Sequence, residues 1–234
     1  MPQGPRAVLL DFYGTLACDV HPLTIDEVLG ARGYSVPGHV REQWWQGDLD
    51  GIEHVAESQS REHYAAFQQE RMLSLLADAD VHPGEYEVIL AELHAGRSDR
   101  KLRAYDEVPD VLRELRARGL TLAICSNWDW DLEPAVAEAG LDDLVDVLVS
   151  SAWAGARKPH PRIFRYVLER VARSPRDVLF VGDTWGPDVE GPRALGMDAA
   201  YLERDEHWPD TTRPSAPALD VPLLRDLAGI LELV

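Results

Sequence analysis

The sequence predicts an α/β protein in which a doubly wound parallel sheet carries an inserted helical cap. Three observations support this fold class. Short apolar runs alternate with helix-like stretches over the C-terminal half of the chain, and short turns join them. Between roughly residues 17 and 99 the pattern changes to apolar residues at helical spacing alone. Such alternation is typical of parallel strands whose connecting helices cover both faces of the sheet.

The expected strands are apolar runs at residues 7–10, 120–125, 145–149 and 178–181, with a weaker run at 198–202. The expected helices lie between them, at residues 108–118, 132–139, 161–172 and 187–195. Pro161 suits a first helical turn, and Gly119, Gly140 and Gly196 suit the residue after a last one. Residues 204–220 are rich in Pro, Ser, Thr and Asp, which indicates a surface loop before a final helix at residues 222–231.

Two domains are expected from the change of pattern. A core comprises residues 1–16 and 100–234, and a helical cap comprises residues 17–99, where runs such as Met72, Leu75 and Leu76 follow helical spacing. A cap inserted directly after the first strand is placed to close over the strand ends, where it excludes water and selects the substrate.

Composition limits the kinds of partner. The chain has 234 residues, 45% of them hydrophobic, and a formal charge of −18 that argues against nucleic acid. No apolar stretch approaches the ~20 residues that span a bilayer, and the N-terminus lacks the length of a signal peptide. Cys18 and Cys125 are expected to be free thiols in a reducing cytoplasm. We therefore expect a cytoplasmic protein, a monomer or homodimer, that acts on a small molecule.

The most informative segment is the end of the first predicted strand. Asp11 closes the apolar run Ala7–Leu10 and is followed by Phe12, Tyr13, Gly14 and Thr15. Ligands of open parallel sheets bind beyond the strand ends, so Asp11 is placed to attack an electrophile. Gly14 lets the backbone approach an anion, and Thr15 can hold that anion or orient the carboxylate.

Further polar groups stand at other strand ends and helix starts: Ser126 with Asn127, Lys158, and Asp183 with Asp188. Three clustered carboxylates would raise one another's pKa values, and one lysine is poor compensation for them. The acidic cluster therefore argues for a cation, and Mg²⁺ prefers oxygen ligands. A competing interpretation is that Asp183 and Asp188 cap the turn and helix near Pro187. Trp128 directly follows Asn127 and could stack on a ring of the substrate.

In this order, the four segments resemble the motifs of the haloacid dehalogenase (HAD) superfamily, in its branch with a helical cap after the first motif. The resemblance covers nearly the whole chain and implies a Rossmannoid core with Asp11 as nucleophile. It also implies that the Ser126 hydroxyl binds the transferred group and that Lys158 offsets charge. The implied Mg²⁺ ligands are Asp11, the backbone carbonyl of Tyr13, Asp183 and Asp188, and the implied substrate contacts are Gly14, Asn127 and Trp128.

Tyr13 departs from the phosphatase motif D-x-D-x-T, whose second aspartate serves as acid and base. Tyrosine has an unperturbed pKa near ~10, so it can donate a proton but is a poor base at neutral pH. Asp19 or His21 could supply the proton instead. Dehalogenases of the superfamily carry D-x-Y-G-T, because halide leaves without a proton. These enzymes use no metal and need a cationic group from the cap, for which Arg32 and Arg41 are candidates.

The acidic fourth motif favours a Mg²⁺-dependent phosphatase that acts on a small phosphorylated metabolite through an aspartyl-phosphate. The first alternative is a metal-independent 2-haloacid dehalogenase. A further alternative is a HAD fold that binds a phosphorylated ligand without turning it over.

Overall fold

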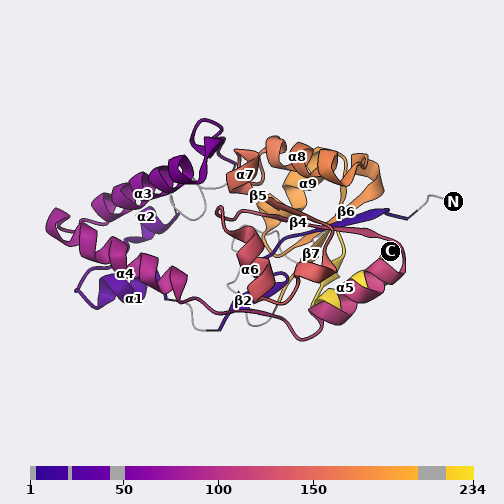
Figure 1. Ribbon diagram of the computed structural model, residues 1–234, viewed down its shortest axis with the longest axis horizontal. Coiled ribbons are helices and arrows are strands. Elements are labelled where there is room, and N and C mark those ends of the chain that lie inside the picture. The colour runs from indigo at the N-terminus through magenta and orange to yellow at the C-terminus, as the bar shows by residue number, and fades with distance from the viewer. Residues whose placement is uncertain (1–3, 21–22, 43–50, 205–219) are drawn as a thin grey trace.

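Figure 1 shows the computed structural model, which describes residues 4–20, 23–42, 51–204 and 220–234. Six parallel strands form one sheet in the order β5-β4-β1-β6-β7-β8. Their bounds are β1 Ala7–Leu10, β4 Thr121–Ser126, β5 Val147–Ser150, β6 Val178–Gly182, β7 Asp198–Leu202 and β8 Leu223–Leu224. The sheet and its connecting helices confirm the predicted doubly wound α/β class.

The strand order reverses at β1. Leu10 pairs with Ile124 of β4 on one side and with Val181 of β6 on the other. The chain runs outward through β4 and β5, then returns to the other side of β1 and runs outward again through β6, β7 and β8. Such a reversal opens a crevice at the carboxyl ends of the central strands, and Asp11 directly follows β1 at that point.

Both faces of the sheet are buried beneath helices. The helices of the core are α5 Val108–Ala117, α6 Leu132–Glu138, α7 Ser151–Ala154, α8 Pro161–Val171 and α9 Gly191–Ala194. Val8 and Leu10 belong to the apolar cluster that contains residues of α5 and α6, whereas Ala7 and Leu9 belong to the cluster that contains residues of α8. This alternation follows from the two-residue period of a strand, so an unbroken apolar run is needed where both faces are covered.

The remaining helices gather to one side of the sheet (Figure 1). They are α1 Ile25–Gly30, α2 Gly38–Glu42, α3 Arg61–Asp78 and α4 Tyr86–Ser98. They share an apolar cluster of their own, which includes Val28, Leu29, Leu75, Leu76 and Ile89. Local signals start two of them: the Thr24 side chain and Glu27 form a capping box on α1, and the Ser60 hydroxyl accepts from the His63 N–H on α3.

The expectation of purely helical structure between residues 17 and 99 is wrong at its start. Strand β2, Ala17–Asp19, pairs antiparallel with β3, Leu102–Ala104, where the chain leaves the sheet for α1 and returns from α4. A strand of three residues is too short to leave a two-residue period that could be recognised against its surroundings.

Two predicted helices near the C-terminus are also replaced. The helix expected at 222–231 is strand β8 followed by a 3₁₀ helix, Leu227–Glu232, because the Asp226 side chain caps Gly229 and Gly229 lies close against Leu224. The helix expected at 187–195 is a π-helical turn, Trp185–Glu190, followed by the short α9. Of the loop expected at 204–220, residues 205–219 lie outside the described residues.

Cys18 and Cys125 are both free cysteines, as expected, and Cys125 is buried in β4. Within the described residues, no helix combines the length and the apolar character that crossing a membrane requires.

Candidate active site

Asp11 stands at the reversal of the strand order with its carboxylate almost buried. Its N–H donates to the Val181 carbonyl at 2.9 Å, which holds the backbone against β6. Its side chain is 10% exposed, and Oδ1 accepts from Lys158 Nζ at 2.7 Å. Burial raises the pKa of Asp11 above its usual value, and the nearby Asp183 adds to this, while Lys158 and a hydrogen bond from Ser126 oppose it.

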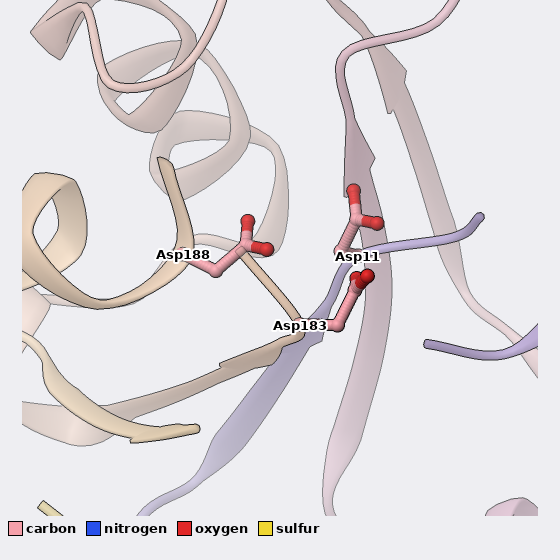
Figure 2. A group of neighbouring side chains, drawn as sticks. All are labelled: Asp11, Asp183 and Asp188. Carbon is pink, nitrogen blue, oxygen red and sulfur yellow. The ribbon is translucent and has the colours of Figure 1, made fainter. Parts of the chain in front are cut away.

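Three carboxylates converge here from two segments, Asp11 after β1 and both Asp183 and Asp188 after β6, as Figure 2 shows. One oxygen from each of Asp11, Asp183 and Asp188 lies within 4.8 Å of the other two. Thr15 Oγ1 donates to Asp183 Oδ1 at 2.9 Å, which links the first motif to the fourth. Oxygen donors at this spacing fit a hard divalent cation such as Mg²⁺. That Asp11, Asp183, Asp188 and the backbone carbonyl of Tyr13 bind the metal stays a prediction.

Asp188 is fixed through both of its carboxylate oxygens. Oδ1 accepts from Lys158 Nζ at 2.6 Å, and Oδ2 accepts from the Thr184 N–H at 2.9 Å. Thr184 is the residue before the π-helical turn, so this bond ties Asp188 back to the start of its own turn. Among the described residues, Thr184 does not make the kind of capping contact that the competing interpretation expected, a side-chain hydrogen bond at the N-cap. A Cβ on Gly182 would lie 2.3 Å from Asp188 Oδ2, so this position needs glycine. Burial raises the pKa of Asp188 to about 8.

Lys158 balances two of the three carboxylates. Its side chain is 2% exposed, and its ammonium lies 5.0 Å from the centre of the Phe180 ring. Burial lowers the pKa of Lys158, but Asp11 and Asp188 together raise it, and the net pKa lies above the usual value. The ammonium therefore stays charged at neutral pH.

Asn127 holds the backbone of Lys158, and its expected contact with substrate stays a prediction. Its Oδ1 accepts from the Lys158 N–H at 2.6 Å, and its Nδ2 donates to the Lys158 carbonyl at 3.0 Å. Both ends of the amide are thus used to fix the loop that carries the ammonium. Ser126, one residue earlier, is 3% exposed and hydrogen-bonds to Asp11, and its predicted contact with the transferred group stays a prediction.

Gly14 lies in a tight turn after the nucleophile, and its predicted approach to an anion stays a prediction. Its φ is 85°, and its N–H donates to the Ala17 carbonyl at 2.9 Å. The glycine therefore permits the tight turn between β1 and β2, and its N–H is committed to that turn.

Trp128 packs beside the first motif. Its ring stands edge-on to Phe12 with centroids 5.2 Å apart, and 6.2 Å from the Tyr13 ring. Only 8% of the residue is exposed. The Arg100 guanidinium lies over the ring, 4.4 Å from its centre. The sequence could not predict this contact, because arginines are common in the chain and Arg100 stands in no motif.

Tyr13 is a protonated phenol in this environment. Burial, with a contribution from Asp19, raises the pKa of Tyr13 to about 12. Its hydroxyl donates to Asp19 Oδ2 at 3.5 Å. Asp19, at the end of β2, has a side chain that is 9% exposed, and its Oδ1 faces Arg100 Nε at 3.6 Å. Burial raises the pKa of Asp19 as well. His21, the other proton donor considered, lies outside the described residues.

A second arginine that the sequence did not indicate supports the first motif. Arg204 follows β7 and donates from Nη2 and Nε to the Thr15 carbonyl, at 2.7 and 3.3 Å. The same guanidinium pairs with Glu107 at 2.7 Å and covers the Tyr105 ring at 3.7 Å. Arg204 is 189 residues from Thr15 in the chain, so no local pattern could show the contact.

The two arginines considered as halide acceptors are paired with carboxylates of the helical segment. Arg32 lies 2.6 Å from Glu92, and Arg41 lies 2.5 Å from Asp26.

Comparison with known proteins shows similarity to haloacid dehalogenase-like hydrolases. The model of the haloacid dehalogenase-like hydrolases matches residues 5–196. Haloacid dehalogenase-like hydrolase domain-containing protein 3 of Homo sapiens is 31% identical over 193 residues, which are 80% of this chain and 68% of that protein. The (S)-2-haloacid dehalogenase of Pseudomonas sp. strain YL is 30% identical over 213 residues, 85% of this chain and 83% of that enzyme.

Similarity extends to phosphatases. The phosphoglycolate phosphatase of Nitrosococcus oceani is 22% identical over 235 residues, 99% of each chain. The crystal structure of a predicted phosphoglycolate phosphatase from Haemophilus somnus superposes with a TM-score of 0.71, at 19% identity and 99% coverage of both chains. At that identity the superposition establishes the fold.

Proposed function

This chain belongs to the haloacid dehalogenase-like hydrolase family, and from that premise we propose that it is a Mg²⁺-dependent phosphatase. Its relatives include both phosphatases and dehalogenases, all of them hydrolases. The observation that carries the proposal is the cluster of Asp11, Asp183 and Asp188 around one ammonium. The substrates are small phosphorylated metabolites. Phosphoglycolate and 2-haloacids, named for two relatives, are both carboxylic acids, so acids are the first metabolites to test.

The charge balance explains why a cation belongs to this site. The three carboxylates face a single ammonium, that of Lys158, and two of the carboxylates are buried. A phosphate monoester would bring further negative charge toward Asp11, and that approach is repulsive without neutralisation. Mg²⁺ would supply that neutralisation, and its ligands would be Asp11, Asp183, Asp188 and the carbonyl of Tyr13.

The reaction we propose has two displacements at phosphorus. Asp11 attacks the phosphoryl group, the ester P–O bond breaks, and the leaving oxygen takes a proton. Water then attacks the aspartyl-phosphate, which releases phosphate and restores the Asp11 carboxylate. Lys158 and Ser126 stabilise the transferring group, and Thr15 orients Asp183. Tyr13 is two residues after Asp11 and its phenol carries a proton. It is therefore the first group to test as the proton donor to the leaving oxygen.

A second candidate function is halide release from 2-haloacids. Tyr13 within Asp11-Phe12-Tyr13-Gly14-Thr15 favours it, as does 30% identity to the Pseudomonas enzyme. The acidic cluster weighs against it, because no metal is needed for that reaction. The ion pairs of Arg32 and Arg41 also weigh against it, because both cations are already matched.

We further propose that residues 17–99 act as a cap over a core of residues 1–16 and 100–234. The antiparallel pair β2–β3 supports this division, since it is where the chain leaves the sheet and returns to it. Asp129, in the loop after β4, accepts hydrogen bonds from Gln68 of α3 and Arg97 of α4, both at 2.7 Å.

The test is hydrolysis of p-nitrophenyl phosphate with about 5 mM Mg²⁺, enough for a weak oxygen-ligand site, against the same protein in EDTA. We expect turnover that requires the metal and disappears in Asp11→Asn. The control is Asp198→Asn, which removes an exposed carboxylate at the start of β7 and should leave turnover unchanged. Phosphate release that survives Asp11→Asn would overturn the proposed nucleophile. Chloride release from 2-chloropropionate, without phosphatase activity, would establish the second candidate instead.

A further inference from the structure

We propose that Arg100 and Trp128 bind a carboxylate on the leaving group of the substrate. The proposal rests on the proposed phosphatase function and narrows its substrates to phosphate esters of small hydroxy acids. Substrate selection would then depend on Arg100, which lies between α4 and β3 and outside the four motifs.

Arg100 and Trp128 lie beside the first motif. The Trp128 ring contacts Phe12 and Tyr13, the two residues that follow the nucleophile Asp11. The Arg100 guanidinium lies 4.4 Å above that ring. A single aromatic side chain therefore separates this guanidinium from the first motif, and such stacking fixes the plane of the guanidinium.

Arg100 and Trp128 also have hydrogen-bond donors available. Arg100 Nε faces Asp19 Oδ1 at 3.6 Å, which is longer than a hydrogen bond. Among the described residues, neither terminal nitrogen of Arg100 has a hydrogen bond or ion pair, and the side chain is 22% exposed. Trp128 Nε1 is buried, and no atom of the described residues accepts a hydrogen bond from it. Buried donors without acceptors are costly, so this stacked pair is suited to an incoming acceptor.

The charges around the site also favour Arg100 as the group that receives a carboxylate. The site already holds Asp11, Asp183 and Asp188, and Asp19 lies beside Tyr13. A leaving group that carries a carboxylate is repelled by these groups unless a cation receives it. Lys158 is already matched by two carboxylates at hydrogen-bonding distance. Among the described residues, the carboxylate that faces Arg100 is Asp19, at a distance longer than a hydrogen bond. A guanidinium presents parallel N–H groups that match the two oxygens of a carboxylate.

The experiment compares two esters that differ only in this group. 2-Phosphoglycolate carries a carboxylate where monoethyl phosphate carries a methyl group. In wild-type protein with Mg²⁺, we expect a higher kcat/KM for 2-phosphoglycolate. Arg100→Gln should lower that value about tenfold or more, mainly through KM, as expected for a lost charge-assisted hydrogen bond. Hydrolysis of monoethyl phosphate should change less than about threefold, since no such bond forms with it.

Two further variants separate recognition from structure. Arg100→Lys keeps the charge and should recover part of the affinity for 2-phosphoglycolate. Arg103→Gln removes a cation three residues further on, in β3, whose side chain is 63% exposed, and should leave both esters unaffected. A wild-type protein without preference between the esters would overturn the proposal. An equal loss for both esters in Arg100→Gln would do the same, because it would indicate a structural role.

A binding measurement distinguishes this proposal from the proposed function. Calorimetric titration of the two esters into Asp11→Asn, with and without Arg100→Gln, requires no turnover. If wild-type protein hydrolyses neither ester but Arg100→Gln selectively weakens 2-phosphoglycolate binding, the carboxylate site stands and the phosphatase proposal falls. If hydrolysis proceeds and Arg100→Gln changes neither binding nor KM, the phosphatase proposal stands and the carboxylate site falls.

Discussion

Lys158 Nζ and Asp188 Oδ1 lie 2.6 Å apart, in an ion pair whose side chains are 2% and 1% exposed. The same ammonium lies 2.7 Å from Asp11. One buried cation therefore joins the predicted nucleophile to the acidic fourth motif, and the stability of the site depends on keeping it. Because burying an unpaired charge is expensive, the two carboxylates cannot keep their ionised forms unaided once the ammonium is removed.

Lys158→Met should therefore lower the free energy of unfolding in EDTA by about 3–5 kcal/mol, the usual cost of breaking a buried pair. Mg²⁺ should restore part of this loss, because the cation replaces the missing positive charge. Urea unfolding with and without Mg²⁺ measures both effects. The chain offers a matched control in its other lysine, Lys101, whose side chain is 77% exposed. A Lys158→Met protein as stable as Lys101→Met would contradict the expectation.

Metal affinity should depend on pH through the same carboxylates. Burial raises the pKa of Asp188 to about 8 and raises that of Asp11, so we expect the metal-free site to take up a proton as the pH falls toward neutrality. Cation binding requires the ionised forms and should release that proton. Apparent affinity should therefore fall as pH decreases below about 8, by at most about tenfold per pH unit for each proton released.

Calorimetric titration of Mg²⁺ in two buffers with different ionisation enthalpies counts the protons released. Asp183→Asn should weaken Mg²⁺ binding, and Asp198→Asn, an exposed carboxylate at the start of β7, should not. Mg²⁺ affinity that is equal near pH 6 and pH 8, without proton release, would show that both buried carboxylates are already ionised.

The parts of this fold that the sequence could predict are those with local signals. Asp11, Ser126 and Asp183 each stand at the end of an apolar run, and parallel strands bring such ends to one edge of the sheet. The runs at Ala7–Leu10 and Asp198–Leu202 match their observed strands in full. Strand β2 could not be predicted, because three residues leave no period.

The parts that could not be predicted depend on partners far away in the chain. The Asn127 amide holds the Lys158 backbone, 31 residues later, and its motif alone could not predict this contact. The support of Thr15 by Arg204 and the stacking of Arg100 on Trp128 are likewise decided by tertiary packing. Motifs identify which side chains meet at the strand ends, whereas the contacts that orient them require coordinates.

Asp129 should govern how firmly the helices α3 and α4 hold to the loop after β4. Its two carboxylate oxygens accept from Gln68 and Arg97, both at 2.7 Å. The Arg97 and Asp129 side chains are 57% and 33% exposed, so Asp129→Ala should cost only about 1 kcal/mol or less of global stability. It should nevertheless speed limited proteolysis of residues 61–98, because both helices lose their contact with this loop.

The control for this change is Asp110→Ala, which removes an aspartate whose side chain is 89% exposed and whose ion pair lies within α5. Proteolysis of residues 61–98 at equal rates in the two variants would mean that Asp129 does not hold the helices.

His54 should make the protein less stable in mild acid. It is 2% exposed and packs 5.5 Å from the rings of Tyr64 and Phe67, with Nδ1 at 2.9 Å from Ser58 Oγ. Burial lowers the pKa of His54 to about 4. Between that value and the unfolded pKa near ~6.5, the unfolded chain binds more protons, so the free energy of unfolding falls as pH falls through this window.

We expect His54 to account for a loss of about 2–3 kcal/mol between pH 7 and pH 4.5, which is the linkage value for a buried group with a pKa shifted this far. His54→Phe keeps an aromatic ring in the cluster and removes the titrating group, so its stability should fall less steeply with acid. His63→Asn removes an exposed histidine from α3 and should follow wild type. Since carboxylates titrate in all three proteins, the difference in slope isolates His54, and equal slopes would show that its imidazole is protonated without penalty in the folded state.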